Sequence, residues 1–282
     1  KCKLAIGAGG IISPSVLLKE IEECGLTKDR LMIDPQAVVI QDTFSEQERQ
    51  LTKLIGSTGV GVGIAVASKV SRNDALLVRD ISELQGMLGS VSDLSSTTIG
   101  QGGKVLIEGS QGFMLSLHHG LYPYVTSRDV TASSLCGEAG IGPIHGSEVI
   151  LVIRTYPIRV AGNSGPLQDE IDWDIVTRES GSLEPLQEYT TVTGNLRRIG
   201  RFNLNEVKRA AAVNSATQIA LTFVDYLNMN DQGVQDYATL QSKTHVFVQE
   251  IEHELQIPVT LIGTGPRFDD IIDLRAEKLG KG

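Results

Sequence analysis

The residues that most directly suggest chemistry lie at positions 55–63, which read Ile-Gly-Ser-Thr-Gly-Val-Gly-Val-Gly. Glycines at such close spacing let backbone amides approach an anion, and the hydroxyl of Thr58 can donate to a phosphate oxygen. The Gly-Lys-Ser/Thr of a Walker A loop does not follow, and the spacing is not that of a dinucleotide-binding fingerprint. The segment alone therefore fits either a phosphate-binding loop or a plain tight turn.

A second candidate for anion binding lies at residues 190–198, which combine threonines, a glycine and two arginines. Guanidinium groups pair with planar anions, so Arg197 and Arg198 can clamp a carboxylate or a phosphate. Adjacent arginines are also common on ordinary solvated surfaces. Both interpretations stay open from the residues alone.

Two further loops carry polar groups suited to a nucleotide. Residues 108–112, Glu-Gly-Ser-Gln-Gly, follow a strand expected at 104–107, which would place the amide of Gln111 where it can donate to and accept from a base edge. Residues 122–127, Tyr-Pro-Tyr-Val-Thr-Ser, present hydroxyls after a proline turn. A surface turn that satisfies its own hydrogen bonds is the alternative for each loop.

His118 and His119 are weak candidates for a catalytic or metal site. Neighbouring residues on a strand point to opposite faces, and no carboxylate or cysteine stands at ligand spacing. We therefore predict structural or surface histidines and no metal site built by the protein.

The elements that must position these loops alternate between extended and helical patterns. Strands are predicted at 3–6, 31–33, 37–40, 104–108, 148–154, 218–225 and 258–262, and helices at 14–24, 44–54, 80–88, 204–216 and 244–255. This alternation predicts an α/β fold with a largely parallel central sheet and flanking helices. Ligands of such sheets bind in the loops beyond the carboxyl ends of the strands.

The rest of the chain suggests no further subdivision. Residues 89–103 are expected to form a surface connection, and residues 163–188 an acidic, irregular stretch. We therefore expect residues 1–282 to form a single domain.

The composition excludes several classes of protein. A chain of 282 residues with 41% hydrophobic residues can bury a sizeable core, and its net charge of -9 argues against nucleic acid as a partner. Three cysteines without Cys-x-x-Cys spacing argue against disulfides and structural zinc, which favours the reducing cytoplasm. No apolar run approaches the roughly 20 residues of a membrane span, and no signal-peptide layout is present. We expect a soluble protein with a small phosphorylated ligand.

Taken together and in this order, the motifs resemble the adenylosuccinate synthetase family over nearly the whole chain. Residues 56–63 match the family's phosphate loop, residues 108–112 its Glu-Gly-Ala-Gln-Gly, and residues 122–127 are nearly unchanged. The series continues with Arg159-Val160, with one motif made of Thr193-Gly194 and Arg197-Arg198, and with residues 263–266. Each motif is weak alone, but six in register are specific. The resemblance implies a fold related to the P-loop NTPases.

The resemblance also implies a ligase that joins L-aspartate to position 6 of a purine nucleotide. A nucleoside triphosphate with Mg²⁺ phosphorylates the six-position oxygen, and the aspartate amine then displaces that phosphate. The protein would be a homodimer, in which Arg72 reaches the nucleotide phosphate of the partner. The family's N-terminal glycine-rich catalytic loop and the segment after it have no match here, so the catalytic residues are expected in a segment that this chain lacks.

Binding roles carry over residue by residue. The resemblance implies that the nucleotide substrate contacts Ser57, Thr58, Arg72, Gln111, Thr126, Ser127, Val160 and Asn195. It implies that aspartate contacts Thr191, Val192, Thr193 and Arg197. The triphosphate would contact Arg197, Phe223, Val224, Asp225, Gly263, Thr264 and Gly265.

The segments 126–129, 157–160 and 190–193 resemble one branch of the family, the phage-associated PurZ-type enzymes that act on dGMP to give N6-succino-2-amino-2'-deoxyadenylate. Departures from the common family pattern point to the same branch. Phe223 replaces a lysine that packs over guanine, Gly263 replaces a serine, and Asn195 replaces an arginine. These changes favour ATP or dATP as donor, with GTP still possible, and the host cytoplasm as location if the gene is phage-encoded. The alternatives are an ordinary adenylosuccinate synthetase that uses IMP and GTP, and a non-catalytic nucleotide-binding paralogue.

Overall fold

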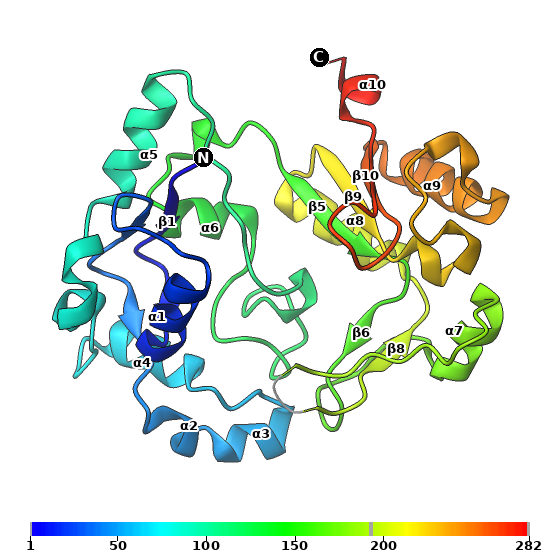
Figure 1. Cartoon of the computed structure of the whole chain (residues 1–282). Coiled ribbons are helices and arrows are strands. Elements are labelled where there is room, and N and C mark those ends of the chain that lie inside the picture. The colour runs from blue at the N-terminus through cyan, green and yellow to red at the C-terminus, as the bar shows by residue number, and fades with distance from the viewer. Residues whose placement is uncertain (1, 192–193, 281–282) are drawn as a thin grey trace. The chain divides into compact units, whose positions relative to one another are not determined.

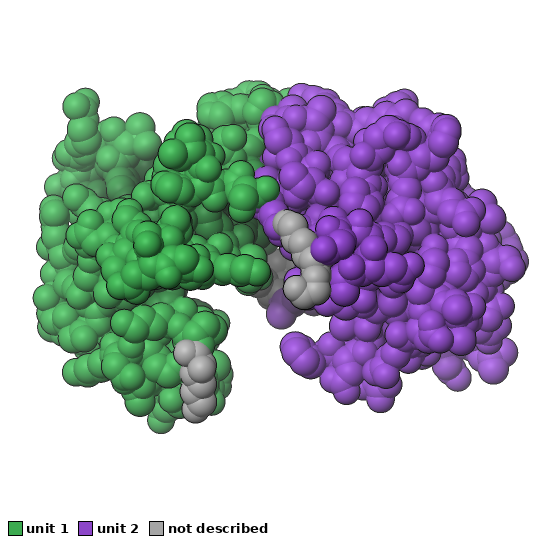
Figure 2. Space-filling model, turned by 90° about the horizontal axis from the view of Figure 1, so that it is seen from above, with its two compact units in different colours: residues 1–147 green, residues 148–282 purple. Residues whose placement is uncertain are grey.

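A computed structural model describes residues 2–191 and 194–280. The chain folds as two compact units, Lys1–Ser147 and Glu148–Gly282, which are green and purple in Figure 2. The expectation of a single domain stays a prediction. Within the described residues, no helix is long and apolar enough to cross a membrane.

The first unit contains two short parallel strand pairs surrounded by helices (Figure 1). Strand β1 (Leu4–Ile6) pairs with β3 (Leu31–Ile33), and β2 (Ile11–Ile12) pairs with β4 (Val38–Val39). The helices are α1 (Pro14–Glu23), α2 (Phe44–Gln47), α3 (Arg49–Ile55), α4 (Val62–Ser71), α5 (Val91–Gly100) and α6 (Ala132–Glu138). Short 3-10 turns are η1 (Val78–Asp80), η2 (Ser82–Met87), η3 (Phe113–Leu115) and η4 (Pro143–His145).

The second unit is built on a four-stranded sheet in the order β11-β10-β9-β5. Strands β5 (Ile150–Arg154), β9 (Gln218–Thr222) and β10 (Val259–Gly263) are parallel, and β11 (Ile271–Asp273) is antiparallel. A smaller antiparallel sheet joins β6 (Ile158–Arg159), β8 (Arg198–Gly200) and β7 (Glu170–Ile171). The helices are α7 (Trp173–Ser180), α8 (Leu204–Asn214), α9 (Ser242–Leu255) and α10 (Arg275–Leu279), with short turns η5 (Val224–Tyr226), η6 (Met229–Asp231) and η7 (Tyr237–Thr239).

Local sequence explains the central elements of the second unit. Strand β9 is buried along nearly its whole length, as expected for an inner parallel strand covered by other elements. Asn203 begins α8 because its side chain accepts the backbone N–H groups of Asn205 and Glu206. Helix α9 contributes Val248 and Ile251 to the core around the sheet. The predicted parallel α/β fold with flanking helices is confirmed.

Four local predictions were wrong. Residues 104–108 form no strand, because no other strand of the described chain pairs with them, and Leu106 is 86% exposed. Residues 89–103 contain α5, which Ser90 caps by accepting the backbone N–H of Asp93 at 3.2 Å. Residues 163–188 contain β7 and α7. Residues 80–88 form 3-10 turns instead of an α-helix.

Candidate nucleotide-binding site

In the second unit, three of the segments considered for ligand binding lie at the carboxyl ends of neighbouring parallel strands. Arg154 ends β5, Phe223 follows β9, and Gly263 ends β10. The carboxyl ends of parallel strands lie at one edge of the sheet, which is where such folds bind ligands. The structure thus brings together the two segments predicted to hold the triphosphate base, residues 223–225 and 263–265.

Asp225, at the same edge of the sheet, has a buried carboxyl group. It is 5% exposed, and its Oδ1 atom has no hydrogen-bond partner among the described residues. Burial raises the pKa of Asp225 to about 6, although backbone N–H groups of the same turn oppose the rise. An unpaired buried acceptor costs about 1–3 kcal/mol, so this oxygen is suited to the donor groups of a bound base.

Phe223 is held in a strained conformation. Its φ of 63° lies in the left-handed region, which costs a bulky residue about 1–3 kcal/mol. Thr155 stabilises this turn, since its Oγ1 donates to the carbonyl of Phe223 at 2.6 Å and its N–H donates to Thr222 at 3.2 Å. The guanidinium of Arg154 lies 3.7 Å from the centre of the phenyl ring. The predicted strand 218–225 ends early because of this turn.

The neighbouring loop after β10 is closely packed. Thr264 Oγ1 donates to the carbonyl of Val234 at 2.9 Å, and its N–H donates to Asp270 at 2.9 Å. A Cβ atom on Gly265 would lie 2.6 Å from Asp270 Oδ2, so only glycine fits there without a shift. A ligand at this loop would therefore meet backbone groups, and not the side chain of Thr264.

The structure shows only part of the aspartate clamp that is predicted at residues 190–198. Thr190 Oγ1 accepts the N–H of Asn195 at 3.0 Å, which closes the turn, and Thr191 and Asn195 are exposed. Val192 and Thr193 lie outside the described residues. Arg198 forms a bidentate pair with Glu170, so it is not available as the second arm of a clamp.

Arg197 is the arginine of this loop that remains for a ligand. Its N–H donates to the carbonyl of Glu188 at 2.8 Å, and its Nε lies 3.4 Å from the carbonyl of Tyr189. Upstream, Val160 is half-buried, and its carbonyl accepts Ser164 Oγ at 2.6 Å.

In the first unit, the glycine-rich loop binds an anion that belongs to the chain itself. The carboxylate of Glu48 accepts the N–H groups of Gly61 and Gly63 at 2.7 Å each, and that of Ile64 at 3.3 Å. These amides begin α4, where the helix dipole favours negative charge. A phosphate would therefore have to bind at the earlier part of the loop, where Thr58 is exposed and Ser57 Oγ accepts the N–H of Gly59. Sequence reasoning missed Glu48.

The remaining predicted residues of the first unit are presented by turns. Gln111 has a φ of 72° and is exposed. Thr126 donates its N–H to Leu115 at 2.7 Å, and the buried Oγ of Ser127 has no partner among the described residues. Arg72 ends α4 in the left-handed region, and its side chain is exposed.

His118 and His119 lie in a turn, not on a strand. The backbone N–H groups of both donate to Ser116 Oγ at 3.2 Å, and the ring of His119 stacks on Phe113. Among residues 2–191 and 194–280, no group of three histidine, cysteine or carboxylate side chains is placed to hold a metal ion.

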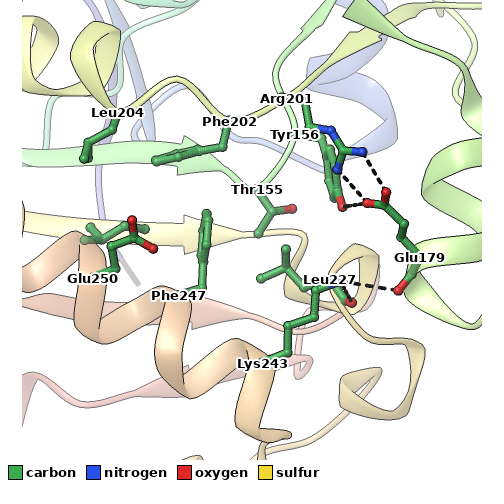
Figure 3. Close-up of a pocket in the computed structure, with 11 residues that line it drawn as sticks. Thr155, Tyr156, Glu179, Arg201, Phe202, Leu204, Leu227, Lys243, Phe247 and Glu250 are labelled. Atoms are coloured by element: carbon green, nitrogen blue, oxygen red, sulfur yellow. Dashed lines mark hydrogen bonds and ion pairs between the residues drawn. The ribbon is translucent and has the colours of Figure 1, made fainter. Parts of the chain in front are cut away.

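One pocket of about 330 Å³ lies in the second unit beside this edge (Figure 3). Phe202 and Phe247 form an apolar side, while Arg201 donates two bonds of 2.6 Å to Glu179. Thr155, which holds the carbonyl of Phe223, also lines it. Its residues come from separate elements without a shared motif, so sequence reasoning did not predict the pocket.

A family model for adenylosuccinate synthetase matches residues 1–86 and 77–232 of the chain. The chain belongs to the adenylosuccinate synthetase family. It is therefore a carbon–nitrogen ligase of the adenylosuccinate synthetase type, a class that binds a nucleoside monophosphate, aspartate and a triphosphate.

Curated relatives include archaeal adenylosuccinate synthetases. That of Methanocaldococcus jannaschii is 43% identical over 282 residues, which cover 98% of this chain and 79% of the relative. That of Archaeoglobus fulgidus is 41% identical over 98% of this chain and 80% of its own length.

Two solved structures share the synthetase fold. The cyanophage S-2L succinoaminodeoxyadenylate synthetase (PurZ), bound to dGMP and dATP as an energy donor, has a TM-score of 0.80 and 29% identity, over 99% of this chain and 79% of its own. The fully ligated adenylosuccinate synthetase of Plasmodium falciparum has a TM-score of 0.84 at 22% identity, over 95% of this chain and 84% of its own.

Proposed function

We propose that this ligase joins L-aspartate to position 6 of dGMP, with ATP or dATP as phosphoryl donor. The observation that carries the proposal is the base segment after β9, where an aromatic ring, Phe223, takes the place of the lysine that covers guanine in common members. An aromatic face stacks on any purine and so weakens the preference for GTP. The similar PurZ structure, bound to dGMP and dATP, supports the same direction.

The acceptor part of the proposal rests on two side chains. Asn195, which replaces the family's arginine, is short and exposed, and so suits a sugar that lacks the 2'-hydroxyl. The 2-amino group of guanine needs an acceptor, and the buried, unpaired hydroxyl of Ser127 lies in the loop where we place the nucleotide. Thr58 and Thr126 would hold the 5'-phosphate, and Gln111 would bind the purine edge.

The chemistry follows from the order of bond changes. The γ-phosphoryl group moves to the six-position oxygen, the aspartate nitrogen then attacks carbon 6, and the carbon–oxygen bond breaks to release phosphate. Mg²⁺ would enter with the triphosphate and neutralise charge on the transferred group. Arg197 would orient aspartate by pairing with a carboxylate, which brings the amine to the reacting carbon.

An ordinary adenylosuccinate synthetase, using IMP and GTP, is the second candidate. The 43% identity to the M. jannaschii enzyme favours it. The test incubates the full-length protein with aspartate, Mg²⁺, each of ATP, dATP and GTP, and either dGMP or IMP, and identifies the products by mass.

We expect the succinylated 2-amino product from dGMP with ATP or dATP. Turnover of IMP with none of dGMP would assign the ordinary reaction. Turnover of neither nucleotide would contradict both candidates.

A further inference from the structure

We infer that Arg154, anchored by Glu188, is a positioning residue that fixes the Phe223 ring as the platform for the triphosphate base. The inference rests on the proposed donor site. It adds two residues that the sequence motifs did not identify.

The first step is the contact between Arg154 and the ring. The guanidinium carbon lies 3.7 Å from the ring centre of Phe223, which is stacking distance for a cation on an aromatic face. Tyr226 meets the same ring edge-on, with centroids 5.1 Å apart. Because Arg154 covers one face of the ring, a stacked purine would have to use the other face.

The second step is the anchor of Arg154. Its Nη1 and Nη2 atoms both donate to the carboxylate of Glu188, and its Nε donates to the carbonyl of Tyr156 at 3.0 Å. The side chains of this ion pair are about one-fifth exposed. A planar guanidinium that is held at three nitrogens has one orientation, so the ring beneath it is held as well.

The third step is the strain in the turn that carries the ring. Phe223 has a left-handed backbone, which its neighbours must maintain. Thr155, the residue after Arg154, stabilises this backbone conformation, because its hydroxyl donates a hydrogen bond to the carbonyl of Phe223. The end of β5 therefore fixes both the backbone and the side chain of the base platform.

A direct binding measurement is available in this unit. Trp173 is the sole tryptophan of the chain, and its ring lies 6.2 Å from that of Tyr226, which in turn contacts Phe223. Titration of the full-length protein with ATP or GTP should therefore change tryptophan fluorescence and give a dissociation constant without turnover.

The variants are Arg154→Ala, Arg154→Lys, Glu188→Gln and Phe223→Leu. Arg201→Ala is the matched control, because Arg201 also forms a bidentate ion pair in this unit but does not contact Phe223. We expect Arg154→Ala to weaken binding of both ATP and GTP on the order of ten-fold. Glu188→Gln should have a smaller effect, and Arg154→Lys should restore part of the loss.

A double-mutant cycle separates positioning from damage to the fold. If Arg154 acts through the ring, Arg154→Ala should weaken binding little further in the Phe223→Leu protein. In steady-state kinetics, the KM for the triphosphate should rise while the KM for aspartate and kcat stay within about two-fold of the parent.

Several results would overturn the inference. They are equal effects of Arg154→Ala and Arg201→Ala, full additivity in the cycle, or a loss confined to one base, which would mean contact with a base edge. Failure of the wild-type protein to bind any triphosphate would also overturn it. Triphosphate binding that depends on Arg154, together with turnover of IMP alone, would support the inference while contradicting the proposed acceptor.

Discussion

Asp225 is a residue whose chemistry the fold changes strongly. Its carboxyl is buried at the end of a parallel strand, with Oδ1 unpaired, and burial raises its pKa to about 6. The folded protein thus binds a proton there more tightly than the unfolded chain, whose aspartate titrates near 3.9. The stability that this proton provides is fully present below about pH 4 and is lost as the pH rises through 6.

Replacement of Asp225 by asparagine should remove this pH dependence. A shift of about two pKa units corresponds to about 2–3 kcal/mol at most, so we expect Asp225→Asn to unfold at higher urea than the parent at pH 8 and to differ little at pH 4.5. It should also bind triphosphate more weakly. Urea titrations of both proteins at the two pH values test this, and a stability difference between Asp225→Asn and the parent that is the same at pH 4.5 and pH 8 would contradict it.

At the scale of elements, the glycine-rich loop at the start of α4 uses some of its backbone N–H groups to bind a side chain of the same chain. Glu48, which is 3% exposed, takes the amides of Gly61, Gly63 and Ile64. Gly61 has a φ of 97°, which a residue with a side chain adopts only with strain. The helix dipole therefore stabilises this carboxylate, which closes α4 onto the end of α2.

Removal of the Glu48 carboxylate should loosen this loop. Glu48→Ala leaves three amides without their acceptor and should lower the free energy of unfolding by about 2–4 kcal/mol, whereas Glu48→Gln, which keeps one oxygen acceptor, should lose less. Urea unfolding measures both. Glu46→Ala is the control, because Glu46 lies in α2, two residues before Glu48, but is exposed. Equal stability of Glu48→Ala and Glu46→Ala would show that the contact contributes nothing.

At the scale of the whole molecule, we propose a homodimer with a shared nucleotide site. Arg72 is exposed at the end of α4, and its side chain has no hydrogen bond or ion pair within the described ranges. Lys69, three residues earlier, is instead used inside the unit, where it donates to Ala8 and Gln36. Arg72 is thus suited to reach the nucleotide phosphate of a partner subunit.

Mixing two inactive variants tests the shared site. Arg72→Ala and Thr58→Ala should each lose most activity, and the mixture should recover about one-quarter of the parent's rate, because half of the dimers are hybrids with one intact site. The assay follows product formation after subunit exchange, with exchange confirmed by mass. Exchange without recovered activity would rule out a shared site, and a monomer in solution would rule out the dimer.

Local patterns in the sequence were enough for several features of this protein. The helical patterns located α1, α8 and α9 to within about two residues, and the alternation of elements predicted the parallel α/β fold. The ordered motifs were specific enough to identify the family. These predictions succeed because helix ends and motif spacing depend on residues that are neighbours in the sequence.

Other features depended on contacts between distant positions. Residues 104–108 have the composition of a strand, but a strand requires a pairing partner, and the described chain provides none. Glu48 reaches amides 13 to 16 positions away, and Arg154 meets Glu188 34 positions away. No local pattern encodes such pairings, because they form only when packing brings separate elements together. The sequence by itself thus determined the fold class and the loops, whereas tertiary structure decided which charges those loops keep free for a ligand.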